Sequence, residues 1–255
     1  FARAVRKPHG IVLVTGPTGS GKSTTVYSAL SSIVCNETNI CTVEDPIEYV
    51  LPGVNQFQVH ERIKLTFPEL LRALLRQDPD VIMVGEIRDP DTCRIAIQAA
   101  LTGHLVLSTL HTNDAASSVA RLTNLGAEPF LISASLEAVL AQRLVRKICT
   151  NCRVEVDAPP NVRAALEAHR LDVDRVFRGR GCGECNRTGT RGRVGIFELF
   201  IPDDRLRNAI ASGGPVEQLR ERAVEGGMKT LAESGLAKAR AGETTFEEVL
   251  RVYSD

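Results

Sequence analysis

The feature that most limits what this chain can fold into is the octapeptide GPTGSGKS near its start. It follows the apolar run Ile11 to Val14 and precedes a stretch that can form a helix. The spacing G-x-x-x-x-G-K-S between a strand and a helix is typical of a loop that wraps phosphate groups with its backbone N–H groups. An ordinary glycine-rich turn is the alternative, and the match at every position argues against it. The octapeptide therefore predicts a nucleotide site in an α/β fold.

Within this loop the sequence assigns individual roles. Lys22 is expected to reach the β- and γ-phosphates, and Ser23 to ligate Mg²⁺. The loop would bind the phosphates of a nucleotide together with Mg²⁺ as a cofactor. The residues expected to bind the nucleotide are Gly16, Pro17, Thr18, Gly19, Ser20, Gly21, Lys22, Ser23 and Thr24.

A second candidate element is the stretch RQDPDVIMVGEIRD, where Asp80 and Glu86 flank the apolar run Val81 to Val84. If that run is a strand, the two acids lie about 20 Å apart and cannot serve the same phosphate. Ligands of open α/β sheets bind at the carboxyl ends of the strands. We therefore expect Glu86 to be the carboxylate on the Mg²⁺ side or the one that activates water, and Asp80 to be a strand-entry residue.

Three more carboxylates are found in CTVEDPIEYV. A strand near Ile40 to Val43 would deliver Glu44 and Asp45 to the same edge, and Pro46 would end it before Glu48. One of the three acids could act as the general base that orients the attacking water. A solvated acidic turn is the alternative for any one of them.

Two histidines border the apolar stretch LVLSTL. His104 precedes it and His111 follows it. The edge argument puts His111 near the γ-phosphate, where it could sense that group, and His104 at the far end. A lone histidine is otherwise more often structural.

The order of the elements predicts the rest of the fold. Strand and helix patterns alternate from residue 11 to about 125, which is typical of a mostly parallel sheet with helices on both faces. FPELLRALL and PDTCRIAIQAAL are predicted helices, the second with Asp89 or Asp91 as its cap. From Glu128 onward the pattern indicates helix. A polar helical insertion is expected over 153–180, then a strand at VGIFELF and four short helices.

Two Cys-x-x-Cys pairs lie in this second half, in KICTNC and GCGECNRTG. Four thiolates in two close pairs satisfy the tetrahedral demand of a structural Zn²⁺. A redox pair and unmetallated packing are the alternatives, and an odd total of 7 cysteines fits a reduced interior better than a disulfide framework. The expected zinc ligands are Cys149, Cys152, Cys182 and Cys185.

Arginines crowd around the second pair, with only Glu184 opposing them. They could screen the negative charge of a zinc–thiolate centre, or form a docking patch for an acidic partner; for any one of them a solvated face is the simpler reading. They are Arg178, Arg180, Arg187, Arg191 and Arg193.

The overall charge excludes some functions. Lys plus Arg and Asp plus Glu number 31 each, so no net positive charge favours nucleic acid as a partner. The longest apolar runs are far too short to span a membrane. The first residue is Phe1, without an initiator Met, and the first strand follows within about ten residues, from which we expect a fragment of a longer protein.

Taken together, these segments resemble the bacterial secretion ATPases, the motors of type II secretion and type IV pilus assembly. GPTGSGKS resembles the Walker A box of that family, VEDPIE its Asp box, LRQDPDVIMVGEIRD its Walker B signature and TGHLVLSTLHTN its His box. The likeness extends from about Pro8 to the tail GETTFEEVLRV. By resemblance, Glu48 and Glu86 are the catalytic acids, and both His104 and His111 belong to the His box.

The resemblance further implies a RecA-like core, hydrolysis of Mg-ATP, a homohexameric ring and inner-membrane platform proteins as partners of a cytoplasmic motor. Many extension and secretion motors of this family hold a tetracysteine subdomain. Family members also carry a domain before the core that supplies arginines to a neighbour's nucleotide, so Arg62 and Arg88 are the arginines left as candidates for phosphate contact here. Arg62 reads more simply as a surface charge.

We therefore expect three segments: a RecA-like P-loop ATPase core over 1–148, a tetracysteine zinc subdomain over 149–192 and a C-terminal strand with a helical region over 193–255. The predicted function is an ATP-driven motor for pseudopilin assembly in type II secretion, with type IV pilus extension as the alternative. A small-molecule kinase and a nucleotide-gated module without turnover are the competing classes. The kinase would need an acceptor-binding lid, which the sequence after residue 125 does not resemble.

Overall fold

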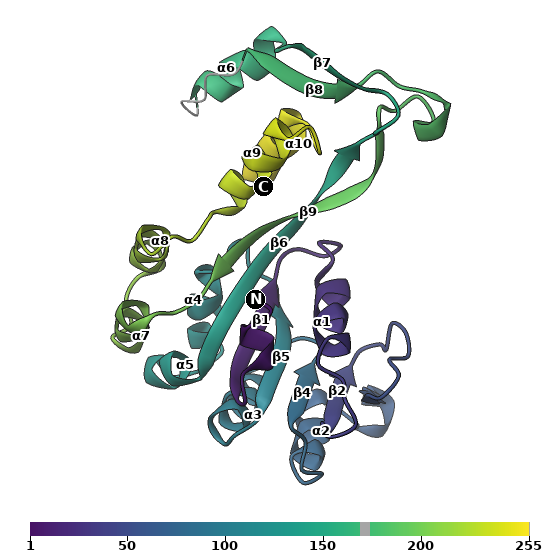
Figure 1. Ribbon diagram of the computed structural model, residues 1–255. Coiled ribbons are helices and arrows are strands. Elements are labelled where there is room, and N and C mark those ends of the chain that lie inside the picture. Colours follow the sequence, from purple (N-terminus) through teal and green to yellow (C-terminus); the bar gives the residue numbers. More distant parts are fainter. Residues whose placement is uncertain (169–173, 255) are drawn as a thin grey trace. The chain divides into compact units, whose positions relative to one another are not determined.

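The computed structural model describes residues 1–168 and 174–254. Figure 1 shows a twisted sheet with helices packed against its faces. The strands are β1 Gly10–Thr15, β2 Ile40–Glu44, β3 Asn55–Gln58, β4 Val81–Val84, β5 Leu105–Leu110, β6 Leu136–Ile148, β7 Arg153–Asp157, β8 Arg175–Gly179 and β9 Thr190–Phe200. The helices are α1 Lys22–Ser31, α2 Phe67–Leu74, α3 Pro90–Leu101, α4 Ser117–Asn124, α5 Pro129–Ser135, α6 Pro160–Ala168, α7 Asp204–Ala211, α8 Val216–Glu225, α9 Leu231–Arg240 and α10 Phe246–Ser254. Three short 3-10 helices are η1 Ala4–Arg6, η2 Glu61–Ile63 and η3 Gly183–Cys185.

The sheet is the one that the alternating pattern predicts. Seven strands lie in the order β3-β2-β4-β5-β1-β6-β9, and the pairs from β3 to β6 along that order are parallel. In register, Thr15 at the end of β1 lies beside Leu110 at the end of β5, and Val84 at the end of β4 beside Ser108. The loops that follow β1, β4 and β5 therefore leave the sheet at one edge, where the predicted site residues gather.

The helices that cover this sheet follow their sequence signals. Asp89 is the cap of α3, because its side chain accepts the N–H of Thr92 at 2.9 Å. In α2, Leu70, Leu71 and Leu74 form the buried face, as the apolar spacing predicts. The fold-class prediction of a mostly parallel α/β sheet flanked by helices is confirmed.

The prediction of helix from Glu128 onward is right only for α5 and wrong for the next thirteen residues, which form β6. This segment, LEAVLAQRLVRKI, is rich in good helix formers, which explains the error. Its first eight residues are all buried, so the strand shows no alternation of apolar and polar side chains. Parallel pairing with β1 overrides the local preference.

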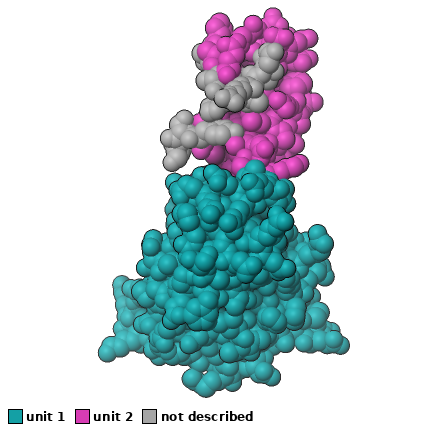
Figure 2. All heavy atoms as spheres, turned by 90° about the vertical axis from the view of Figure 1, so that its left-hand side faces the viewer, with its two compact units in different colours: residues 1–141, 199–228 teal, residues 142–198, 229–255 magenta. Residues whose placement is uncertain are grey.

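The chain divides into two compact units, coloured separately in Figure 2. The first contains residues 1–141 and 199–228, and the second contains residues 142–198 and 229–255. The strands β6 and β9 each contribute residues to both units. The sequence segments 1–148, 149–192 and 193–255 stay a prediction about folding units, and the tetracysteine segment lies wholly within the second unit.

The second unit replaces the expected helical insertion with a strand, a helix and a strand. The strands β7 and β8 pair antiparallel, with Val156 opposite Val176, and α6 lies between them in sequence. Part of the insertion, residues 169–173, lies outside the described residues. Side chains from the β7–β8 pair and the residue after β7 pack with side chains from α6, α9 and α10 to form a small core. Its buried members are Ala158, Val162, Val176, Ala239, Phe246 and Val249. The later predictions of a strand at VGIFELF and of four helices after it are confirmed by β9 and by α7 to α10.

One ion pair in this unit has a stability consequence. Glu248, 3% exposed, accepts hydrogen bonds from the backbone N–H of Arg146 at 2.9 Å and from its guanidinium at 2.9 and 2.7 Å. Burial alone would raise the pKa of Glu248, but the hydrogen bonds from Arg146 outweigh it and hold that pKa below 4.5. We expect Glu248→Ala to lower the free energy of unfolding by about 1.5–3 kcal/mol, toward the lower end because the guanidinium is partly exposed.

The pH dependence follows from the sign of the shift. A carboxyl with a lowered pKa contributes stability that is fully present above its unfolded pKa and is lost as the pH falls through the lowered value. Denaturant titrations at pH 7 and below pH 4.5 should therefore show the variant's deficit shrinking in acid. The exposed neighbour Glu247 supplies the control, Glu247→Ala, and an equal loss in both variants would contradict the assignment.

Candidate functional site

The phosphate-binding loop connects β1 directly to α1. Gly19 and Gly21 have φ values of 78° and 89°, a left-handed region that residues with a side chain rarely adopt. The ammonium of Lys22 donates to the carbonyls of Gly16 at 2.8 Å and Pro17 at 3.0 Å, so its side chain folds over the loop. The helix α1 starts without a side-chain cap and without an acidic residue in its first turn. This combination of glycine backbone, lysine and uncapped helix start suits an anion.

Glu86 and His111 meet at the same edge of the sheet. Glu86 follows β4 and His111 follows β5, and His111 Nε2 lies 3.4 Å from Glu86 Oε2. Arg88 forms an ion pair with the same carboxylate oxygen. The two strand ends are fixed by hydroxyl groups: Ser108 donates to the carbonyl of Val84, and Thr109 to that of Gly85.

Burial and the positive charge of Lys22 favour the neutral form of His111. Burial lowers the pKa of His111 below 6.5, and the nearby positive charge of Lys22 lowers it further, while Glu86 opposes both. Lys22 therefore lies close enough to His111 to act on it electrostatically. A neutral imidazole with one N–H and one bare nitrogen can both donate to a phosphate oxygen and accept a proton.

A threonine pair joins this loop to the phosphate loop. The hydroxyl of Thr15, the residue before Gly16, donates to the carbonyl of Leu110 at 3.1 Å and accepts the N–H of Thr112 at 2.9 Å. The two threonine hydroxyls are 2.7 Å apart. The chain neighbours of His111, Leu110 and Thr112, are therefore both hydrogen-bonded to the hydroxyl of Thr15 at the end of β1. Thr15 carries no signal of this role in the sequence, where it reads only as the last residue of an apolar strand.

The acidic stretch after β2 separates its three carboxylates. Glu44 is the last residue of β2 and is 3% exposed, with its oxygens bonded to Tyr27, Thr42 and Gln56. Asp45 and Glu48 are exposed in the following loop. Two of the three candidates for a general base are therefore exposed. Of these two, Glu48 has its backbone N–H hydrogen-bonded to the hydroxyl of Tyr27.

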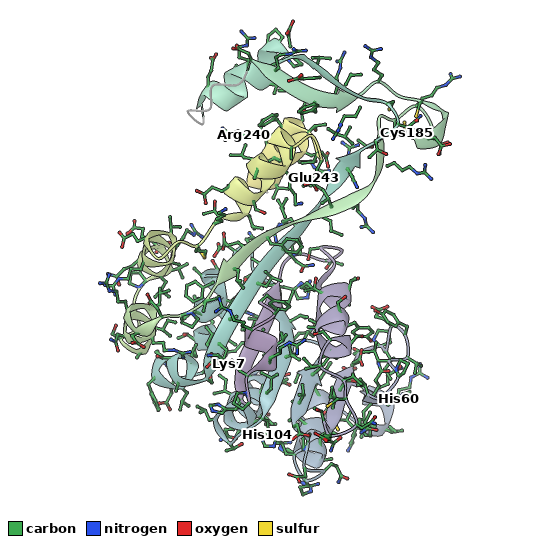
Figure 3. The ribbon with its side chains drawn as sticks, viewed as in Figure 1. Lys7, His60, His104, Cys185, Arg240 and Glu243 are labelled. Atoms are coloured by element: carbon green, nitrogen blue, oxygen red, sulfur yellow. The ribbon has the colours of Figure 1, made fainter. Side chains whose placement is uncertain are left out.

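Other sequence candidates lie elsewhere. His104 precedes β5, and its Nδ1 is 3.0 Å from the carbonyl of Ala99 at the end of α3; Figure 3 shows it at the lower part of the sheet. The six residues of β5 put it about 20 Å from His111. Asp80 precedes β4 and accepts the N–H of Asn39, in keeping with strand entry. Arg62 is exposed in η2. His104 and Asp80 therefore lie at the opposite ends of their strands from His111 and Glu86, whereas Arg62 follows the carboxyl end of β3.

The four paired cysteines converge in the second unit, where Figure 3 labels Cys185. All four Sγ atoms lie within 4.8 Å of one another. None of the four forms a disulfide. The sulfurs of Cys149 and Cys182 are 3.9 Å apart, those of Cys152 and Cys185 3.9 Å, and those of Cys182 and Cys185 3.8 Å, well beyond the length of an S–S bond. Zn–S bonds of about 2.3 Å in a tetrahedron give S···S separations of about 3.8 Å. The four cysteines therefore fit a tetrahedral zinc ion.

Hydrogen bonds around the cluster favour thiolates. The sulfur of Cys185 accepts the N–H of Cys182 at 3.2 Å and that of Gly189 at 3.3 Å, which lowers the pKa of Cys185 to about 6. Burial, with hydrogen bonds from the neighbouring sulfurs, raises the pKa of Cys152 to about 11. One sulfur is thus ready to bind a cation, and a bound dication would draw the proton from the others.

The five arginines near the second cysteine pair lie on the surface, and their screening or docking role stays a prediction. The five side chains are exposed, and backbone N–H groups are the donors to Cys185. Only Arg191 has an ion pair recorded within the described part of the chain, with Glu184.

Comparison with known proteins decides the family. Residues 1–251 match the family described as "Type II/IV secretion system protein". The chain belongs to this family. Among the relatives of this secretion ATPase chain is the type II secretion system protein HxcR of Pseudomonas aeruginosa, 54% identical over 251 residues that cover 98% of this chain and 50% of the relative. The type IV pilus assembly ATPase PilB of Thermus thermophilus is 53% identical, over 98% of this chain and 28% of PilB.

Solved structures agree with the fold. The pilus retraction motor PilT, solved with bound ADP, is 32% identical with a TM-score of 0.75, and the match covers 100% of this secretion ATPase chain and 64% of PilT. The chain spans half or less of the length of the two curated relatives named above. No helix in the described ranges is both long and apolar enough to cross a membrane.

Proposed function

We propose that this chain is the ATP-hydrolysing part of a motor that powers pseudopilin assembly for type II secretion. The observation that carries the proposal is the meeting of the Lys22 loop with Glu86 and His111 at one edge of the sheet, in a chain that belongs to the secretion family. HxcR, the relative named for type II secretion, at 54% identity, favours this system. PilB, at 53%, supports type IV pilus extension as the second candidate.

The chemistry assigned to each residue is part of the same proposal. The loop from Gly16 to Thr24 would cradle the phosphates, with Lys22 on the β/γ side. Ser23 and Glu86 would hold Mg²⁺, whose charge stabilises the leaving phosphate oxygens. Glu48 would orient the attacking water, and neutral His111 would contact the γ-phosphate. The four cysteines would hold a structural Zn²⁺ that takes no part in hydrolysis.

The proposal extends to the assembly. Drawing on the family, we propose a homohexameric ring in the cytoplasm, held at the inner membrane by platform proteins rather than by a span of its own. Nucleic acid has no part in it, since the net charge of the chain is +0. Because His104 lies about 20 Å from His111, our proposal gives the sensing role to His111 alone.

The test is steady-state release of phosphate from ATP, compared with the Lys22→Ala variant. Loss of the ammonium should reduce turnover by at least about 100-fold, because it removes the charge that faces the developing negative charge of the transition state. The protein should release phosphate without a second substrate, unlike a kinase. Tight ATP binding with no turnover in the unaltered protein would favour a nucleotide gate instead, and unchanged hydrolysis in Lys22→Ala would contradict the site.

A further inference from the structure

A buried carboxylate next to the proposed site has no part in the proposed chemistry. Glu44 lies at the end of β2 and is 3% exposed. Its Oε2 accepts the hydroxyl of Tyr27, and its Oε1 accepts the hydroxyl of Thr42 at 2.5 Å and the amide of Gln56 at 3.0 Å. Three donors thus surround a carboxylate that solvent and substrate barely reach, and such a group is expensive to bury unless it is fully bonded.

Two of those donors also bind the backbone of the loop that carries Glu48. The hydroxyl of Tyr27 accepts the N–H of Glu48 at 3.3 Å. The amide of Gln56 donates to the carbonyl of Tyr49 at 3.2 Å, and its oxygen accepts the N–H of Leu51 at 2.7 Å. The loop backbone is therefore held at Glu48 and at two positions after it by side chains that Glu44 orients.

The elements that supply these side chains are independent of the loop. Tyr27 lies on α1, the helix that begins at Lys22, and Gln56 lies on β3, next to β2 in the sheet. The rings of Tyr27 and Tyr49 pack edge to face with centroids 4.5 Å apart. The contacts thus connect the helix of the phosphate loop to the backbone at 48–51 through a single hydroxyl group and a single ring pair.

We propose that Glu44, Tyr27 and Gln56 are positioning residues that hold the loop 45–51, and with it Glu48, in the arrangement needed for ATP hydrolysis. The inference rests on the proposed function. It assigns the three acids of VEDPIE different roles: Glu44 orients, Glu48 acts on water and Asp45 does neither. It also gives Tyr27, which the sequence reads only as a residue on a helix face, a task at the site.

The state of the hydroxyl supports this arrangement. Burial, followed by the hydrogen bond to Glu44, raises the pKa of Tyr27 to about 12. The phenol therefore keeps its proton over the whole working range. It can donate to Glu44 and accept from Glu48 at the same time, since a hydroxyl has one donor and two acceptor sites.

The chain offers a matched pair of variants. Tyr27→Phe and Thr42→Val each remove one hydroxyl donor to Glu44, but only the Tyr27 hydroxyl also binds the Glu48 N–H. With all natural flanking sequence kept, we expect Tyr27→Phe to lower kcat for ATP hydrolysis by about 10- to 100-fold, with KM for ATP changed less than about twofold, because the loop shifts while the phosphate loop stays intact. Thr42→Val should lower kcat by less than about threefold, and both variants should lose similar amounts of melting temperature.

A third variant tests the other side of the loop. Gln56→Leu keeps the size of the side chain and removes its bonds to Tyr49 and Leu51, so it should repeat the selective loss of kcat. Combined with Tyr27→Phe, it should cost less than the product of the two single losses, because both hold the same loop. Equal kcat in Tyr27→Phe and Thr42→Val would overturn the inference. So would a rise in KM for ATP that accompanies the fall in kcat of Tyr27→Phe.

The experiment also separates this inference from the function on which it rests. Lys22→Ala is measured in the same series. If Lys22→Ala abolishes turnover while Tyr27→Phe matches Thr42→Val, only the positioning role is wrong. If Lys22→Ala retains turnover, the proposed function itself fails.

Discussion

Glu48→Gln is expected to bring ATP hydrolysis close to a stop, slowing kcat by about 10²- to 10⁴-fold, while ATP still binds. The exposed carboxylate of Glu48 would take up the proton of the attacking water, and an amide of nearly the same shape cannot. The amide keeps the loop intact, since the bond to Tyr27 comes from the backbone of residue 48. Single-turnover hydrolysis and equilibrium binding of a fluorescent ATP analogue measure the two effects separately.

The neighbouring acids supply matched controls for this result. Asp45→Asn replaces an exposed carboxylate three positions away in the same loop and should leave kcat within about threefold. Glu44→Gln changes the buried acid and keeps an oxygen that can still accept from Tyr27, so it should slow hydrolysis less than Glu48→Gln does. A larger loss of kcat in Glu44→Gln or Asp45→Asn than in Glu48→Gln would show that Glu48 is not the general base.

Cys182→Ser is expected to lose stoichiometric zinc and the fold of residues 149–168 and 174–185, while ATP binding at Lys22 survives. The free energy with which a structural zinc site binds its metal is part of the folding free energy of its segment. The small core of the second unit, with six buried members, leaves the knuckle at residues 149–152 and 182–185 dependent on the metal. Native mass measurement reports the zinc, and limited proteolysis between residues 149 and 185 reports the loss of order.

Cys35→Ser is the matched control, because Cys35 is an exposed cysteine that takes no part in the cluster. It should keep one zinc per chain and the proteolysis pattern of the unaltered protein. Removal of the metal with a chelator should reproduce the effect of Cys182→Ser in the unaltered chain and have no further effect in that variant. Retention of a full equivalent of zinc in Cys182→Ser would contradict the four-ligand site.

Much of the candidate site could be predicted from the sequence because its residues sit where strands end. The positions of Gly16, Glu86 and His111 follow from one rule about the carboxyl edges of parallel strands. The same rule separated His111 from His104, which the family resemblance groups together. The cysteine cluster was equally predictable, since four thiols in two close pairs have few other uses.

The parts that the sequence could not predict depend on contacts between distant residues. The helix-forming composition of β6 is overridden by pairing with β1, which no local pattern reveals. Glu44 and Glu48 look alike in VEDPIE, and only the bonds to Tyr27 and Gln56 separate a buried anchor from an exposed acid. Tyr27 and Gln56 themselves belong to no motif. Their role depends on hydrogen bonds that the folded chain creates, from the Tyr27 hydroxyl to two partners and from the Gln56 amide to three.

The course of the chain through its two units limits how they can be taken apart. The first unit is made of two pieces, 1–141 and 199–228, with most of the second unit inserted between them. No single truncation releases the nucleotide-binding unit intact: ending the chain at residue 141 removes α7 and α8, and ending it at 228 keeps 142–198. Isolation would require an internal excision that rejoins β6 to β9, strands that are neighbours in the sheet. Proteolytic cleavage at one site within 142–198 would leave two fragments. Each fragment contains one of the two pieces of the first unit, so the sheet and helices of that unit would hold them together.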